Sequence, residues 1–300
     1  MMLGRTLGGV PPTARRRLVD HYGQVVSPWL DVVPELMTEV ASRWKLALID
    51  YHDAGCASSI ALARTPEGRR VLVKAWYERS RYADEVGALG TWRGRRVPKV
   101  IHTADDLDVA AVELVAGRPG GTLRPPGELE AVALALADLH SPPCPAGTFS
   151  RLDEYLYTVV LPRIDRRLGS VDVDIPANCL EWLSGLDPNA GSPALLHADL
   201  YRENVLFDID ERPVFVDPLP MIGSPIFDWA FWVVYYDLLS DPGPRLRLAI
   251  AIGEVLPADL LPWCLCLCVD GLLYYRETGD PRAPRMADVM AMMYERAAGC

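Results

Sequence analysis

The segment that most constrains this chain is the polar run from His197 to Asn204, together with the acidic residue that follows it at Asp217. The run reads His-x-Asp, four residues, then Asn. Apolar residues precede it at Leu195-Leu196, and two apolar stretches follow, at 205–207 and 214–216. Alternating apolar strands and polar ends predict that the polar residues meet at a crevice rather than on open surface.

Three of these residues match the needs of phosphoryl transfer to a hydroxyl. A carboxylate must orient the hydroxyl and take its proton, and oxygen ligands must hold Mg²⁺ against the nucleotide phosphates. Asp199, Asn204 and Asp217 fit those roles in that order. The alternative is an Asx-rich surface loop, which does not explain the flanking strands. We assign His197 a packed, hydrogen-bonded role rather than proton transfer.

A second pair of residues lies upstream. Lys74 ends the strand pattern Val-Leu-Val-Lys, and Glu85 follows eleven residues later in a predicted helix. A lysine there presents a compact charge to nucleotide phosphates when an acid holds it in place. Taken alone, a strand that ends in lysine is more often a solvated edge. The downstream motif favours the functional interpretation.

The apolar patterning predicts an α+β chain whose first part is rich in strands and whose remainder is helical. The boundary is predicted between Val115 and Gly121. We expect strands at 46–49, 60–63, 70–75, 97–102 and 109–115, with helices at 27–44 and 79–92 and a phosphate-covering turn at 53–59. Later helices are expected at 128–140, 224–236, 245–255, 258–278 and 285–297.

Composition excludes some classes of partner. Lys and Arg number 30 and Asp and Glu 40, a net charge of −10, which argues against nucleic acid or an anionic membrane as partner. No secretory signal precedes Tyr22, and the apolar run Leu260–Tyr275 is interrupted by Pro262 and Asp270. We therefore expect a cytoplasmic protein. Three alternating cysteines, Cys264, Cys266 and Cys268, are expected in the core.

The motifs resemble the signature of the aminoglycoside phosphotransferase-type kinases. The resemblance rests on His197 to Asn204, on Val216-Asp217-Pro218 and on Phe227-Asp228-Trp229-Ala230. The path from Asp217-Pro218 through Gly223 to Asp228 is similar to the streptomycin 6-phosphotransferase and hydroxyurea phosphotransferase branch. The resemblance implies a bilobal protein-kinase-like fold. Residues 1–115 would form a nucleotide-binding N-lobe with an antiparallel sheet, and residues 116–300 a mostly helical C-lobe with the catalytic loop and substrate site.

The resemblance also implies roles for individual residues. Asp199 would be the catalytic base, and Asp228 would brace its loop from a buried helix. The remaining positions would bind ATP and Mg²⁺: Lys74 with Glu85 and the loop residues Ser58 and Ser59 at the phosphates, the hinge from Glu113 to Val115 at adenine, and Asn204 and Asp217 at the metal. Three departures are Ala198 in place of glycine, Leu219 in place of a lysine common in the streptomycin branch, and a single glycine, Gly55, in the phosphate loop.

These inferences lead to the expectation of an ATP- and Mg²⁺-dependent O-phosphotransferase that confers antibiotic resistance. The expected acceptor is a small cationic aminoglycoside such as streptomycin, with acidic residues of the helical lobe binding its amines. One alternative is a metabolic kinase of the same fold, acting on a sugar, an amino alcohol or a natural-product intermediate. Another is a catalytically silent binding module, against which the complete set of motif residues argues.

Overall fold

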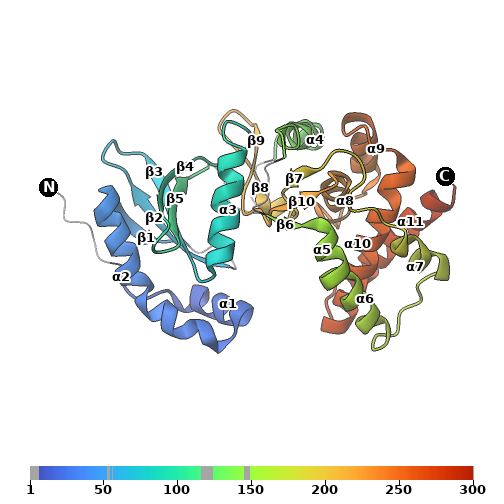
Figure 1. Ribbon diagram of the computed structural model, residues 1–300, viewed down its shortest axis with the longest axis horizontal. Helices are drawn as coiled ribbons and strands as arrows, with labels where there is room; N and C mark the ends of the chain where they lie inside the picture. The colour runs from blue at the N-terminus through green and yellow to red at the C-terminus, as the bar shows by residue number, and fades with distance from the viewer. Residues whose placement is uncertain (1–6, 53–54, 56, 116–123, 145–148, 300) are drawn as a thin grey trace. The chain divides into compact units, whose positions relative to one another are not determined.

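The computed structural model describes the chain except for residues 1–6, 53–54, 56, 116–123, 145–148 and 300. The chain divides into two compact units, Met1–Pro119 and Gly120–Cys300 (Figure 1). The predicted lobe boundary at Val115 to Gly121 lies largely outside the described residues.

The first unit is built on a five-stranded antiparallel sheet with the order β1-β2-β3-β5-β4. The strands are β1 (Ala47–Tyr51), β2 (Ser58–Arg64), β3 (Arg70–Trp76), β4 (Val100–Ala104) and β5 (Val109–Glu113). Strand β3 lies at the centre, where Lys74 pairs with Ile60 on one side and with Ala110 on the other. Hydrogen bonds on both edges make β3 a rigid support for the side chains it carries.

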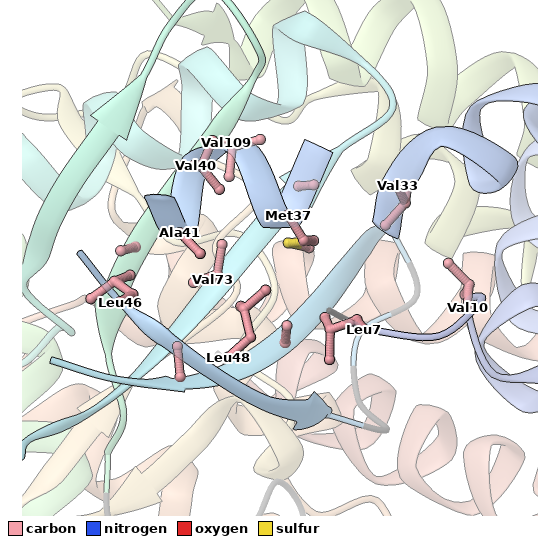
Figure 2. Packing of buried hydrophobic residues seen from close by; sticks show 14 of the residues in the cluster. Leu7, Val10, Val33, Met37, Val40, Ala41, Leu46, Leu48, Val73 and Val109 are labelled. Carbon is pink, nitrogen blue, oxygen red and sulfur yellow. The ribbon is translucent and has the colours of Figure 1, made fainter. Parts of the chain in front are cut away.

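Side chains of β3 alternate between two differently covered faces of the sheet. Val71, Val73 and Ala75 enter a buried apolar cluster with α2 (Ser27–Trp44), which contributes Val33, Met37, Val40 and Ala41. Figure 2 shows Met37, Val40 and Ala41 among the strand residues Leu48, Val73 and Val109, with Val33 farther along the helix and nearer Val10. Lys74 and Trp76 belong to the opposite set, and both contact Glu85 of α3 (Arg79–Thr91).

Two local features of this unit differ from the sequence prediction. The predicted turn at 53–59 lies partly outside the described residues, and its last two residues, Ser58 and Ser59, pair with Trp76 and Ala75 and so begin β2. A helix before Ser27, α1 (Pro12–Tyr22), was not predicted from the sequence. It begins with proline in its first turn and buries only Ala14 and Leu18, so its apolar signal is weak.

The second unit contains two small sheets. In the three-stranded sheet, β10 (Met221–Gly223) lies between β6 (Ser150–Arg151) and β7 (Ala194–Leu196). Strands β8 (Val205–Phe207) and β9 (Pro213–Phe215) form an antiparallel hairpin. A side chain at Gly223 would place its Cβ 2.4 Å from the Cβ of Leu152, so glycine there permits the close approach of residue 152, at the start of the helix that follows β6.

Helices make up most of the second unit (Figure 1). They are α4 (Glu128–Leu139), α5 (Leu152–Tyr155), α6 (Leu161–Leu168), α7 (Ala177–Ser184), α8 (Ile226–Tyr235), α9 (Gly243–Ile252), α10 (Pro257–Thr278) and α11 (Ala283–Ala298), with a π-helical turn at Leu156–Val160. The predicted α+β fold class is confirmed, with a five-stranded antiparallel sheet followed by a mostly helical part.

Helix α10 runs through Pro262 and Asp270, as the helix predicted at 258–278 does, although both residues interrupt the apolar run. Asp270 is accommodated because arginines of α6 bind its carboxylate. The helix is long and apolar enough to cross a membrane, but 78% of its most apolar window is buried inside the protein, as in a core helix. Cys264, Cys266 and Cys268 are all buried, as predicted, and burial raises the pKa of each thiol.

Candidate active site

The predicted catalytic residues lie in a tight loop that follows β7. Ala198 has φ +57°, a left-handed conformation, and the next residue is Asp199. The N–H of Tyr201 donates to the carbonyl of Asp199 at 2.9 Å. The side-chain amide of Asn204 donates both to that carbonyl, at 2.8 Å, and to the Asp199 carboxylate, at 2.7 Å. The amide therefore fixes both the backbone and the half-buried side chain of Asp199.

The β8–β9 hairpin brings Asn204 and Asp217 to the same end. Asn204 directly precedes β8, whose first residue, Val205, pairs with Phe215 at the end of β9. The N–H of Val216 then donates to the carbonyl of Asn204 at 2.9 Å, one residue before Asp217. Asp217 has φ +54°, a conformation that is uncommon for residues with a side chain. One hairpin thus brings Asn204 and Asp217, thirteen positions apart in the sequence, to the same end.

A buried carboxylate holds the start of the catalytic loop. Asp228, in the first turn of α8, is fully buried. Its two oxygens accept the backbone N–H groups of His197 and Ala198, each at 2.8 Å, and one of them also bonds the ring Nε2 of His140 at 2.9 Å. Charge-assisted hydrogen bonds of this kind are stronger than neutral ones. Asp228 therefore stabilises the left-handed turn, as the resemblance implied.

His197 connects the catalytic loop to the strand that ends at Asp217. Its Nε2 donates to the carbonyl of Val216 at 3.1 Å, and its own carbonyl accepts the N–H of Leu219 at 2.9 Å. The side chain is completely buried, and burial lowers its pKa to about 4. The ring is neutral at physiological pH, which agrees with a packed, hydrogen-bonded role.

Three residues that sequence reasoning missed, Arg124, Glu128 and Tyr236, form hydrogen bonds that support this loop. The guanidinium of Arg124 donates to the carbonyls of Val205 and Arg202, each at 2.8 Å. Glu128 accepts from the Arg202 side chain at 3.1 Å and from the Tyr236 hydroxyl at 2.7 Å. These contacts span 74 to 108 positions of sequence, so no local pattern could have indicated them.

Lys74 and Glu85 form a buried ion pair in the first unit. Lys74 Nζ lies 2.5 Å from Glu85 Oε1, and the side chains are 5% and 11% exposed. The second carboxylate oxygen of Glu85 accepts the indole N–H of Trp76 at 3.1 Å. The ammonium also lies 5.1 Å from the centre of the Trp76 ring. The structure thus brings together the predicted pair and adds Trp76, which sequence reasoning did not identify.

The other predicted nucleotide-binding residues occupy different settings. Ser58 and Ser59 are buried at the start of β2, at 5% and 2% exposure. Glu113 is the exposed last residue of β5, and Val115 follows it two positions later. Helix α1 contacts the loop before β2, because the hydroxyl of Tyr22 donates to the carbonyl of Ala57 at 3.0 Å. That helical support was also missed from the sequence.

The oxygen atoms near Asp199 are suitable ligands for a hard cation such as Mg²⁺. With its amide nitrogen bonded to Asp199, Asn204 retains an Oδ1 that accepts no hydrogen bond among the described residues. The carboxylate of Asp217 supplies further oxygens. Among the described residues, no cluster of three or more His, Cys, Asp or Glu could form a metal cage of protein groups alone. Mg²⁺ in kinases is held by one or two side chains and by phosphates, which suits this set.

Comparison with known proteins relates the chain to one protein family and to two enzymes of similar length. Residues 62–263 match the sequence model of the phosphotransferase enzyme family. Streptomycin 6-kinase of Streptomyces glaucescens is 26% identical over 286 residues, which cover 90% of this chain and 92% of that protein. The streptomycin 6-kinase of Streptomyces griseus is also 26% identical, over 79% of each chain.

A solved structure supports the same fold. Macrolide 2'-phosphotransferase MphH from Brachybacterium faecium superposes with a TM-score of 0.60 at 19% identity, covering 86% of this chain and 97% of that one. At this identity the similarity concerns the fold alone.

Proposed function

We propose an activity for this chain on the premise that it belongs to the phosphotransferase enzyme family, which confirms the resemblance seen in its motifs. Enzymes of this family are kinases that act on small molecules. The proposed activity is the ATP- and Mg²⁺-dependent phosphorylation of one hydroxyl of a cationic aminoglycoside such as streptomycin. The phosphate would add about two negative charges to the drug, weaken its binding to its target and so confer resistance.

The observation that carries this proposal is the similarity to two streptomycin 6-kinases. It extends over 90% of the chain in one case and 79% in the other, so it includes both units. The charge of the protein agrees with a cationic acceptor, since acidic residues exceed basic ones by ten.

Each site residue would have a defined task in this reaction. Asp199, whose carboxylate is held by Asn204, would orient the acceptor hydroxyl and take its proton. Lys74 would face the nucleotide phosphates in a direction set by Glu85 and Trp76. Mg²⁺ would bind Asn204 and Asp217 and would neutralise charge on the transferred phosphoryl group. Most of the acceleration would come from positioning and electrostatics.

The proposal is tested with purified protein, ATP, Mg²⁺ and streptomycin. We expect a product heavier than streptomycin by one phosphoryl group, and growth of a susceptible bacterium on streptomycin when the protein is expressed. Omitting Mg²⁺ should abolish the product. Absence of both product and protection would contradict streptomycin as the acceptor.

A metabolic acceptor is the second candidate, because a probable ketoamine kinase of Enterococcus faecium is 31% identical over 123 residues, or 33% of this chain. The same assay should therefore include a ketoamine, a sugar and an amino alcohol beside other aminoglycosides. Transfer to one of these with none to any antibiotic would favour the metabolic role. If no acceptor is phosphorylated, the result favours neither the antibiotic nor the metabolic role.

A further inference from the structure

Tyr201 lies next to the proposed catalytic base, and nothing in the preceding reaction uses it. It follows Asp199 by two residues, and its N–H donates to the Asp199 carbonyl at 2.9 Å. The ring is half-buried, and its hydroxyl has no hydrogen-bond partner among the residues that the structure describes. A tyrosine with an unused hydroxyl beside a catalytic residue is available to a ligand.

Two aromatic residues of α8 fix the orientation of the Tyr201 ring. Phe231 contacts it edge-on, with ring centres 5.1 Å apart, and Tyr235 does so at 5.4 Å. Tyr235 is itself fixed, because its hydroxyl donates to the carbonyl of Leu267 at 3.0 Å. Gly271 permits that approach, since a Cβ there would lie 2.3 Å from the Tyr235 oxygen. The Tyr201 ring is therefore preorganised.

Helices α5 and α10 and the start of α11 supply further polar groups to this region. The pKa of Tyr201 is raised, first by burial and then by the negative charge of Asp199, with smaller influences from Tyr275, Arg282 and Tyr155. Residues near positions 155 and 275–282, far from Tyr201 in the sequence, thus lie within electrostatic reach of its hydroxyl.

The acids of this region are occupied by arginines of the same chain. Asp270 accepts from Arg163 at 2.8 Å and from Arg167 at 3.1 Å. Asp280 pairs in the same way with Arg282, at 2.7 Å. Each of these carboxylates therefore already has a cationic partner within the chain.

Two tyrosine rings of the region already have guanidinium groups near them. Arg282 lies 4.5 Å from the centre of the Tyr275 ring, and Arg163 lies 5.8 Å from that of Tyr155. Among the described residues, no arginine or lysine lies over the Tyr201 ring. Of the three tyrosines, Tyr201 is the one whose ring no arginine or lysine of the described residues covers.

We propose that Tyr201 is the residue that positions the acceptor. A cationic ring of the acceptor, such as a guanidinium- or ammonium-bearing cyclitol, packs on the Tyr201 ring, and one of its hydroxyls bonds the tyrosine hydroxyl. A neighbouring hydroxyl of the same ring is then held at Asp199. This assignment rests on the proposed function and names the feature of the site that recognises the acceptor: an aromatic face rather than a free carboxylate.

The test compares Tyr201→Leu, Tyr201→Ala and Tyr201→Phe with the wild type. For each, KM for the acceptor, KM for ATP, kcat and acceptor-free ATP hydrolysis are measured. Leucine and alanine should raise the acceptor KM roughly tenfold or more, as expected for loss of a desolvated cation–aromatic contact. Phenylalanine should have a smaller effect because it keeps the ring. KM for ATP and acceptor-free hydrolysis should stay within about twofold.

Tyr157→Ala is the matched control, because Tyr157 is 53% exposed on the π-helical turn and is not among the groups that act on the Tyr201 hydroxyl. It should behave like the wild type. The proposal is overturned if folded Tyr201→Leu keeps the wild-type acceptor KM. It is also overturned if both KM values and the hydrolysis rate change together, which indicates a structural role. The acceptor used is streptomycin or, if that is not phosphorylated, whichever compound of the panel is. A wild type that phosphorylates none of them overturns the proposed function and this inference together.

Discussion

The carboxylate of Asp228 accepts the backbone N–H of Ala198 at 2.8 Å, at a residue whose φ is +57°. A left-handed conformation is unfavourable for alanine by about 1–2 kcal/mol. The buried acid therefore maintains a strained turn that places Asp199 immediately after it. The two residues support each other: the carboxylate holds the turn, and the N–H groups that the turn presents stabilise the buried carboxylate by hydrogen bonding.

Replacement of Asp228 by asparagine should destabilise the protein and slow the reaction. Asparagine has one acceptor oxygen in place of two, so one of the backbone N–H groups of His197 and Ala198 loses its partner. An unsatisfied buried donor costs about 1–3 kcal/mol. Urea denaturation should show a loss of that size, and kcat should fall with little change in KM for ATP. Unchanged kcat would show that the turn does not depend on Asp228.

Replacement of Ala198 by glycine should have the opposite effect on stability. Glycine adopts φ +57° without the steric penalty of a Cβ, although it adds entropy to the unfolded chain. The expected net gain in the free energy of unfolding is about 0.5–1 kcal/mol by urea denaturation. Glycine at Ala194, in the strand just before, is the control and should destabilise. A loss of stability in Ala198→Gly would mean that the turn is not strained.

Stability should fall as the solution becomes acidic, because the pKa of buried His197 is lowered from 6.5 to about 4. Between these values the unfolded chain binds a proton that the folded protein does not. The free energy of unfolding should therefore decrease as pH falls from 6.5 to 4, by up to about 3 kcal/mol, and this contribution should be constant below pH 4.

Comparison with His197→Gln isolates this contribution from those of the carboxylates. Glutamine keeps a donor for the carbonyl of Val216 but does not titrate. The difference in unfolding free energy between wild type and variant should therefore depend on pH in the window from 6.5 to 4. If the unfolding free energies of wild type and variant change with pH in parallel throughout that window, the result would contradict burial of His197 as a neutral ring.

Replacement of Lys74 by methionine should affect both stability and nucleotide binding. It removes the ammonium from the buried Glu85 carboxylate, which keeps its hydrogen bond from the Trp76 indole. Loss of one partner from a buried pair costs about 3 kcal/mol, and the affinity for ATP should fall. The additional change Glu85→Gln should restore part of the stability but not the affinity, as measured by denaturation and calorimetry. Lys45→Ala, at an exposed lysine, is the control.

Much of the fold could be predicted because its elements carry local signals. Helix α2 runs from Ser27 to Trp44, as the Ser-Pro start and apolar spacing predicted. Strand β3 and helix α3 were also predicted to within a residue or two. Helices α5 to α7 were missed: α6 buries only Ile164 and Arg167, and the arginine is held by acids of α10 rather than by an apolar face.

The site was predictable where residues lie close in the sequence. Asp199 and Asn204 are five positions apart, and the structure joins them by hydrogen bonds. The pairing of Lys74 with Glu85 followed from strand and helix signals eleven residues apart. The contacts of Arg124, His140 and Tyr201 could not be predicted, because each depends on α8 or on the loop after β7, far away in the sequence. Such contacts are decided by tertiary packing.

The most direct test of the account is transfer of the γ-phosphoryl group of ATP to the acceptor by Asp199→Asn. Asparagine keeps the size of the side chain and its hydrogen bonding to the loop but cannot accept the hydroxyl proton. A general base contributes about 10²–10⁴ to the rate. We therefore predict a loss of that size in kcat, with wild-type affinity for ATP and Mg²⁺ and an unchanged melting temperature. Transfer at the wild-type rate by a folded Asp199→Asn protein would contradict the account.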